Sequence, residues 1–154
     1  MSGTWVNPST PNLTDFTTFV QNGMGISATY LPTSSDYLQW SLNIATAETL
    51  TDDCIPPPIY VLAVYNCGGH HLITMAQDQP GLTYFQDARL RFGINSFVAG
   101  VVQSSSDQGT SNALVVPESF QALTISDLEY LRTPWGRAYL GYAQKFGPTV
   151  VVGV

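Results

Sequence analysis

The strongest constraint on the fold is a long, mostly apolar stretch, residues 59–76, which directly follows the prolines at positions 56–58. Proline breaks the interior of a helix but fits its first turn, where the N–H group has no intrahelical partner. We therefore predict a helix over residues 59–76, with Pro58 in its first turn. Its sides are nearly all apolar, so we expect it to be the central element. Gly68 and Gly69 each cost about 1 kcal/mol in a helix, which indicates that a neighbouring helix approaches closely there.

Two helices are predicted on the N-terminal side of this element, from the spacing of the apolar residues. A short one begins near Leu13 and ends before Gly23. Thr33 and Asp36 resemble a capping box, in which side chains satisfy the first N–H groups of a helix. The helix that this box opens is expected to run to about residue 50, with a broad apolar face.

The C-terminal half is predicted to add further packed segments. Residues 82–92 form either a short helix or an irregular packed segment. Ser126 or Asp127 caps a short helix that runs to residue 132. Pro134 opens a last helix that ends at about residue 146, because a Gly-Pro pair follows and cannot continue it. Together these elements predict a mainly α fold, a small helical bundle.

Extended structure is predicted in two places. Residues 97–102 and 112–116 are expected to pair as a β-hairpin that protrudes from the bundle at about residues 97–116, with residues 104–111 as its loop. The end of the sequence is uncharged and rich in β-branched residues, so it has high strand propensity and must pair with its own domain or with another chain. We interpret it as a docking strand made of Thr149, Val150, Val151, Val152, Gly153 and Val154.

The chain is therefore expected to hold one domain with two extensions. Residues 1–11 form a polar, flexible N-terminal arm, residues 12–147 form the helical domain, and residues 148–154 form the extended tail. The first residues lack the basic region and apolar run of a signal peptide. Polar residues interrupt the stretch 59–76, so it is not expected to span a membrane.

Charge is scarce and unevenly distributed. Charged residues make up 10% of the chain, against about 25% in ordinary soluble proteins. A surface this neutral is poorly protected against association, and we infer that much of it is covered in the working state. The alternative is a Thr-rich monomer that tolerates low charge. Residues 1–88 hold seven acidic residues and no Lys or Arg, whereas the remainder has a net charge of +1. This acidic pole argues against phosphate binding and suits head-to-tail contacts in a ring.

Cys67, His70 and His71 form the cluster that most resembles a metal site. On a helix they lie near one face, and Cys54 could join them from the adjoining turn. Structural zinc sites use paired ligands at short spacing, and this pattern departs from that. We therefore expect no metal, no cofactor and two buried free thiols. One histidine is expected to be buried and hydrogen-bonded, while the other faces an interface or water.

The sequence holds no catalytic motif that we recognise. A nucleophilic serine or cysteine needs an oriented base beside it, and the two histidines of this chain are adjacent in sequence. A G-x-S-x-G elbow, a P-loop and a dinucleotide-binding glycine motif are all absent from the sequence. The acidic residues are scattered, without a close pair for general acid and base work. We therefore expect a protein that is not an enzyme.

Aromatic residues gather around the predicted last helix. Trp135, Tyr139 and Tyr142 lie at spacings of four and three residues, which places them on one helical face. Tyr130 and Trp135 flank the turn before that helix, and they fit a core role and an interface role equally well. We take both as candidate partner contacts.

The order of these elements resembles the head-to-tail connector proteins of tailed bacteriophages, also called adaptor or head-completion proteins. In one such group a T-P-aromatic-G signature precedes an aromatic helix, and the similar segment here is Leu131-x-Thr133-Pro134-Trp135-Gly136-x-x-Tyr139-Leu140. A family helix that closes with Ala-His-Leu is similar to Gly69-His70-His71-Leu72. With the Gly/Ser-rich hairpin, these matches cover roughly residues 35–147. The chain departs from the family pattern in its few Lys and Arg residues, in Trp135 where Tyr is more usual, and in the central Gly-Gly pair.

The resemblance implies a virion structural protein of the neck, made in the host bacterial cytoplasm. Such proteins form a ring, commonly dodecameric, between the portal protein and the tail or neck proteins, and their C-terminal segment reaches onto the portal. The ring extends the DNA channel. An acidic channel would repel phosphates and let DNA pass without specific binding. Candidate channel-lining acids, chosen because they fall in predicted loops, are Asp52, Asp53 and Asp78. We expect no membrane partner.

Two alternative functions stay open at this point. The first is a neck or tail-terminator protein of the same virion, which would purify with tails rather than with heads. The second, more remote, is a small metal-dependent or thiol enzyme that uses Cys67, His70 and His71.

Overall fold

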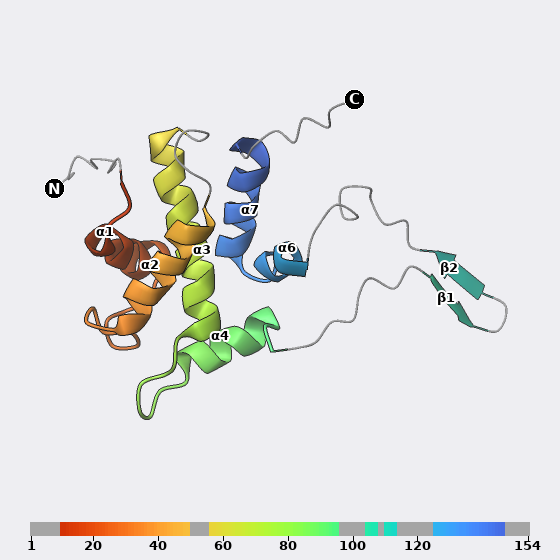
Figure 1. The fold of residues 1–154 in the computed structure, drawn as a ribbon. Coiled ribbons are helices and arrows are strands. Elements are labelled where there is room, and N and C mark those ends of the chain that lie inside the picture. The colour runs from red at the N-terminus through yellow and green to blue at the C-terminus, as the bar shows by residue number, and fades with distance from the viewer. Residues whose placement is uncertain (1–9, 50–55, 96–103, 108–109, 114–124, 147–154) are drawn as a thin grey trace.

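The computed structural model describes residues 10–49, 56–95, 104–107, 110–113 and 125–146, and it describes residues 104–107, 110–113, 125 and 126 by their backbone alone. Within these ranges the chain is mainly helical, which confirms the predicted mainly α class (Figure 1). The elements are α1 (Leu13–Thr18), the π-helical turn η1 (Phe19–Gly23), α2 (Asp36–Glu48), α3 (Pro57–Met75), α4 (Tyr84–Phe92), β1 (Ser104–Asp107), β2 (Thr110–Ala113), α6 (Ile125–Tyr130) and α7 (Pro134–Phe146).

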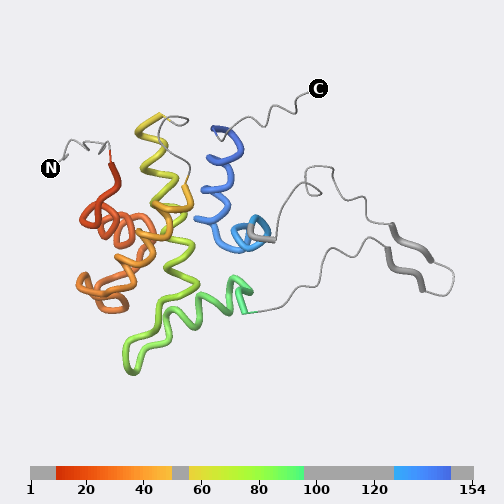
Figure 2. Tube along the Cα trace, in the orientation of Figure 1, coloured from red at the N-terminus to blue at the C-terminus, as the bar shows by residue number. Residues whose placement is uncertain are grey.

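Helix α3 is the centre of the fold, as its apolar sequence predicts. Helices α1 and α2 lie on one side of α3, and α7 lies on the other side (Figure 2). The N-terminal and C-terminal helices are therefore separated by α3. Pro57 and Pro58 occupy its first turn, where a missing N–H removes no helical hydrogen bond. Every residue from Ala63 to His70 is buried, because neighbours cover all sides of this part of the helix.

The glycine pair of α3 makes room for the N-terminal segment. A Cβ atom at Gly68 would lie 2.9 Å from the ring of Phe16, and one at Gly69 would lie 2.9 Å from the sulfur of Met24. The close approach predicted for this pair is therefore confirmed. The approaching groups are single side chains from α1 and from the residue after η1, whose bulk fits against α3 only where a Cβ is missing.

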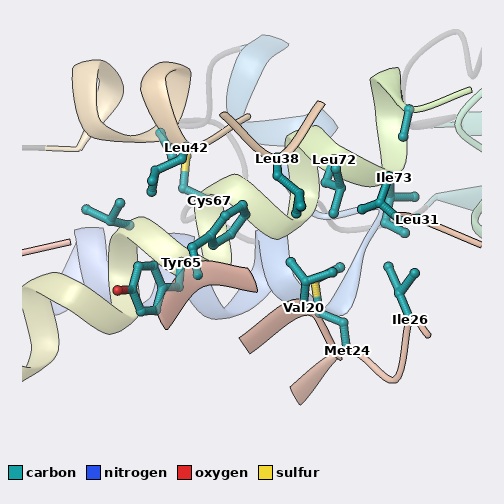
Figure 3. Close-up of a cluster of buried hydrophobic side chains, with 14 of the residues drawn as sticks. Val20, Met24, Ile26, Leu31, Leu38, Leu42, Tyr65, Cys67, Leu72 and Ile73 are labelled. Atoms are coloured by element: carbon teal, nitrogen blue, oxygen red, sulfur yellow. The ribbon is translucent and has the colours of Figure 1, made fainter. Parts of the chain in front are cut away.

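The hydrophobic core surrounds α3 and draws side chains from α1, η1, α2 and α4 (Figure 3). Val20, Leu38, Leu72 and Ile73 converge there, and each is at most 1% exposed. Burying such a side chain contributes about 1.5–3 kcal/mol. Phe85 of α4 is fully buried and belongs to the same cluster. For residues 82–92 the sequence left two possibilities, and the structure shows a packed helix over Tyr84–Phe92 of this segment.

Two predicted helix starts differ from the structure. The capping box at Thr33 is wrong, because a turn closed by the Ser35 N–H on the Pro32 carbonyl takes up Thr33. Ser35 is the N-cap of α2, and its hydroxyl accepts the N–H of Tyr37. Similarly, α6 begins at Ile125, so Ser126 and Asp127 lie inside its first turn instead of capping it. The helices themselves form as predicted, because apolar spacing decides their existence and local side-chain geometry decides their ends.

The predicted hairpin is not supported in the form expected. Strands β1 and β2 pair antiparallel, with Ser104 opposite Ala113 and Asp107 opposite Thr110, so they fall largely in the segment predicted as the loop. Serine and threonine are typical of loops, yet main-chain hydrogen bonds pair polar residues as readily as apolar ones, and this is why the strands occupy the predicted loop. The expected first strand, residues 97–102, and residues 114–116 of the second lie outside the described residues. A ribbon this short adds little stability, and the fold remains mainly α.

Parts of both extensions lie outside the described ranges. These are residues 1–9 of the N-terminal arm and the whole C-terminal tail, residues 148–154. None of the helices in the described ranges has the length and apolar character that a membrane span requires.

Candidate functional site

The Thr-Pro-Trp-Gly sequence forms the turn that begins α7. Thr133 is fully buried, and its hydroxyl oxygen accepts the N–H of Gly136 over 3.0 Å. Its carbonyl accepts the N–H of Arg137 over 3.0 Å. Pro134 is the first residue of the helix, a position suited to proline's fixed backbone angle. Thr133 therefore acts as the N-cap of α7.

The same hydroxyl connects α7 to α3 through His70. The Oγ1 atom of Thr133 lies 2.8 Å from Nδ1 of His70, whose side chain is 4% exposed. The hydroxyl therefore makes two hydrogen bonds: it accepts the Gly136 N–H, and it shares a second bond with Nδ1, whose donor is set by the tautomer of the imidazole. Burial, with a smaller repulsion from His71, lowers the pKa of His70 to about 4. His70 is thus the buried, hydrogen-bonded histidine that the sequence predicts.

His71 belongs to a second polar cluster, formed with Glu48, Cys67 and Tyr130, which we call the carboxylate cluster. One oxygen of Glu48, Oε2, accepts from Nε2 of His71 over 2.7 Å and from the Cys67 thiol over 3.6 Å. It also accepts the hydroxyl of Tyr130. That hydroxyl lies 3.2 Å from Nε2 of His71 and 3.7 Å from the Cys67 sulfur. Three groups from α3 and α6 therefore meet one carboxylate oxygen at the end of α2.

Burial governs the protonation of this cluster. It raises the pKa of the Cys67 thiol to about 12 and raises the pKa of Tyr130 above its ordinary value. Burial would also raise the pKa of Glu48, but hydrogen bonds from Tyr130 and His71 outweigh it and hold this pKa below its ordinary value. The cluster thus holds a carboxylate, a neutral thiol and a neutral phenol. A thiol kept protonated in this way is a poor nucleophile.

A cavity of about 240 Å³ lies beside the two histidines. Its lining residues come from α3, from α6 with the turn after it, and from the turn after α4. They are His70, His71, Thr74, Ile94, Glu129 and Arg132. The guanidinium of Arg132 donates to the carbonyls of Gly93 over 2.6 Å and Ile94 over 2.9 Å, so it ties the two turns together across the cavity.

The outer surface formed by α1 and α2 is a second candidate site, and we call it the α1–α2 face. It carries two carboxylates: Asp15, which accepts from the side chain of Asn12 over 2.7 Å, and Asp36, which is exposed in the first turn of α2. Trp40 is 52% exposed and Leu13 is 36% exposed on it. Uncharged residues line an open groove there: Pro11, Asn12, Leu13, Gln39, Leu42, Asn43, Thr46 and Ala47. Exposed apolar groups that gather beside a neutral groove are typical of contact surfaces.

The predicted site residues are dispersed. Tyr130 belongs to the carboxylate cluster, whereas Trp135 is half-buried and meets Phe92 edge-on with ring centroids 6.0 Å apart. The carboxylate of Asp78 accepts the N–H groups of Phe85 over 2.6 Å and Gln86 over 2.9 Å, at the start of α4. Asp52, Asp53, Cys54 and the tail, Thr149 to Val154, lie outside the described residues.

Sequence reasoning missed two residues of these sites. Glu48 and Thr133 are 23 and 63 positions away from the histidines that they contact. The Thr-Pro pair before a helix is an N-cap signal that could have identified Thr133. Nothing local marks Glu48, because its partners come from later helices.

We compared the chain with known protein families, curated proteins and solved structures. No protein-family model, curated protein or solved structure matches the chain. The sites above must therefore be interpreted from their own chemistry.

The low pKa of His70 predicts a loss of stability in acid. Its pKa falls from the ordinary 6.5 to about 4 on folding, so between these values the unfolded chain binds a proton that the folded chain does not. The stability due to neutral His70 is complete above about pH 6.5 and declines toward pH 4, by up to about 1.4 kcal/mol per pH unit.

This loss can be measured by urea unfolding between pH 7 and pH 4.5 with a chelator in the buffer. NMR of the imidazole rings separates His70 from the carboxylates that titrate in the same range. A His70 ring that stays neutral at pH 5 agrees with the prediction, and one that titrates near pH 6.5 contradicts it.

Proposed function

We propose that this chain is a virion structural protein that forms a ring between the portal and the tail of a tailed bacteriophage. The observation that carries the proposal is the α1–α2 face, where Trp40 is half-exposed beside a groove lined by uncharged residues. Exposed aromatic residues are enriched at the centres of protein interfaces. A groove lined by uncharged residues can be covered by a neighbouring copy at low cost, because no ion in its lining loses hydration.

The buried polar groups also support a structural role. The Cys67 thiol is fully buried, and the high pKa of this thiol keeps it out of nucleophilic chemistry. His70 is hydrogen-bonded to Thr133 through Nδ1, and His71 donates to Glu48 through Nε2. Both histidines therefore connect helices through hydrogen bonds. Neither imidazole is available as a general base for the Cys67 thiol.

The finer parts of the proposal come from the sequence. The segment from Thr149 to Val154 docks onto the portal, with Tyr130 and Trp135 as further partner contacts. Asp52, Asp53 and Asp78 face the DNA channel, and a hairpin at about residues 97–116 protrudes from the ring. The ring is dodecameric and lies in the neck of a virion that assembles in the host cytoplasm. DNA passes through it without specific binding.

Replacing Trp40 with glutamine tests the α1–α2 face. The substitution should leave the free energy of unfolding within about 0.5 kcal/mol, because the side chain is half-exposed. Incorporation into portal-containing particles should fall by about tenfold or more, as expected for an aromatic interface anchor. Leu90→Gln is the matched control, since Leu90 is an apolar residue of α4 that is 67% exposed. Equal incorporation of the two variants would contradict the assignment of this face.

Deletion of residues 149–154 tests the docking tail in the same assay. We expect the truncated chain to keep its helical circular dichroism and unfolding midpoint but to block stable head completion. Particle composition and negative-stain microscopy provide the measurement. If the full-length chain is never found in portal-containing particles, the proposed function is wrong.

A further inference from the structure

The carboxylate cluster brings together three groups that bind transition metals, two from α3 and one from the end of α2. Cys67 and His71 lie four residues apart on α3, so they project from the same face one turn apart. Glu48 lies at the end of α2. The carboxylate oxygen, the Cys67 sulfur and the His71 nitrogen all lie within 4.8 Å of one another.

One separation within this group already matches a tetrahedral zinc site, and a second is shorter than such a site requires. With the usual zinc–ligand distances, neighbouring ligand atoms are separated by about 3.4–3.6 Å. The sulfur of Cys67 lies 3.6 Å from Oε2 of Glu48, which fits this range. Nε2 of His71 lies 2.7 Å from the same oxygen, a hydrogen-bond distance that has to lengthen by about 0.7 Å to reach the zinc value.

The hydroxyl of Tyr130 is the nearest further candidate ligand. It lies 3.7 Å from the Cys67 sulfur and 3.2 Å from Nε2 of His71, and it donates a hydrogen bond to Glu48. The Tyr130 and Glu48 oxygens therefore have to separate before both can bind one ion. The second histidine predicted for this cluster, His70, is directed to Thr133 instead.

We propose that Glu48, Cys67 and His71 bind a Zn²⁺ ion, with the oxygen of Tyr130 as the fourth ligand atom. A thiolate, a carboxylate, a neutral imidazole and a neutral hydroxyl balance the two charges of the ion. Binding releases the Cys67 proton to solvent, and the imidazole proton moves to Nδ1. Mixed sulfur, nitrogen and oxygen ligands of this kind favour zinc over magnesium or calcium.

The site is accessible from one side and closed on the other. The side chains of Glu48 and His71 are 42% and 18% exposed, so an ion can enter between them, whereas the Cys67 sulfur forms the buried floor. A bound ion would join the end of α2, the middle of α3 and the end of α6. Its role is therefore to stabilise the packing of these helices, independently of the proposed ring.

Zinc titration of the full-length, chelator-treated protein tests the proposal. We expect one zinc per chain by elemental analysis after dialysis, together with a higher unfolding temperature when zinc is present. Cobalt(II) serves as a spectroscopic substitute, because a thiolate ligand produces a charge-transfer absorption band. That band should disappear in Cys67→Ser and persist in Cys54→Ser.

Two carboxylate variants keep the test decisive if Cys67→Ser does not fold. Glu48→Gln should weaken zinc binding by at least about tenfold. Glu129→Gln removes an exposed carboxylate that lines the neighbouring cavity and is not a proposed ligand, so this variant should bind zinc like the unmodified chain. Circular dichroism checks that both remain helical. A chain that retains no zinc, equal affinity in the two variants, or a cobalt band that survives Cys67→Ser would overturn the proposal.

Discussion

We expect Gly136→Ala to lower the free energy of unfolding by at least about 3 kcal/mol, since overpacking of this kind has to move backbone. A Cβ atom at Gly136 would overlap the carbonyl oxygen of Tyr130, and it would lie 2.8 Å from the carbonyl carbon and 2.9 Å from Nδ1 of His70. The carbonyl belongs to the end of α6, so the turn between α6 and α7 would have to open. Opening it would also separate His70 from Thr133.

Gly141→Ala is the matched control for this prediction, because both glycines belong to α7. A Cβ atom at Gly141 would meet no other atom within 4 Å. Alanine is the better helix former, so this variant should be stabilised by about 0.5–1 kcal/mol. Urea unfolding followed by circular dichroism measures both variants. Similar effects of the two substitutions would show that the contact between Gly136 and Tyr130 does not constrain the turn.

We expect Thr133→Val to cost about 3 kcal/mol, for two reasons that act together. Valine keeps the shape of threonine but removes the hydroxyl that accepts the Gly136 N–H and is hydrogen-bonded to Nδ1 of His70. Helix α7 then loses its N-cap. The buried imidazole, 4% exposed, loses its partner at Nδ1.

Thr133→Ser separates the hydroxyl from the methyl group. Serine retains both hydrogen bonds and loses one methyl, so it should cost about 0.8 kcal/mol. The comparison uses the same urea unfolding measurement. If serine and valine were equally destabilising, packing rather than hydrogen bonding would account for the role of Thr133.

These two predictions assign a physical role to each part of the Thr-Pro-Trp-Gly sequence. Threonine caps α7 and binds His70, proline begins the helix, and glycine allows the turn to pack against the end of α6. Trp135 contributes a ring contact to Phe92 of α4 and lies 3.5 Å from the position of a Cβ at Gly69. In this fold the motif that resembles a phage family signature therefore connects α7 to α3 and α6.

The sequence by itself determined most of the helices and their order, whereas α4 was left open between a helix and an irregular segment. The apolar character of α3, the prolines at its start and the proline that begins α7 are local signals, because helix formation depends on neighbours within about one turn. The Gly68–Gly69 pair also predicted a close approach correctly, since few other causes justify its cost. The predicted positions of the hairpin strands were wrong because local sequence signals do not distinguish polar strand residues from a polar loop.

Only the tertiary structure decided which polar groups meet. Cys67, His70 and His71 are neighbours in sequence, and helical geometry alone placed them near one face. Packing sends His70 to Thr133 and brings His71 and Cys67 to Glu48, a residue that no local pattern connects to them. Contacts between helices depend on how whole helices pack. The strength of a polar contact depends on how deeply it is buried, and sequence spacing does not report burial.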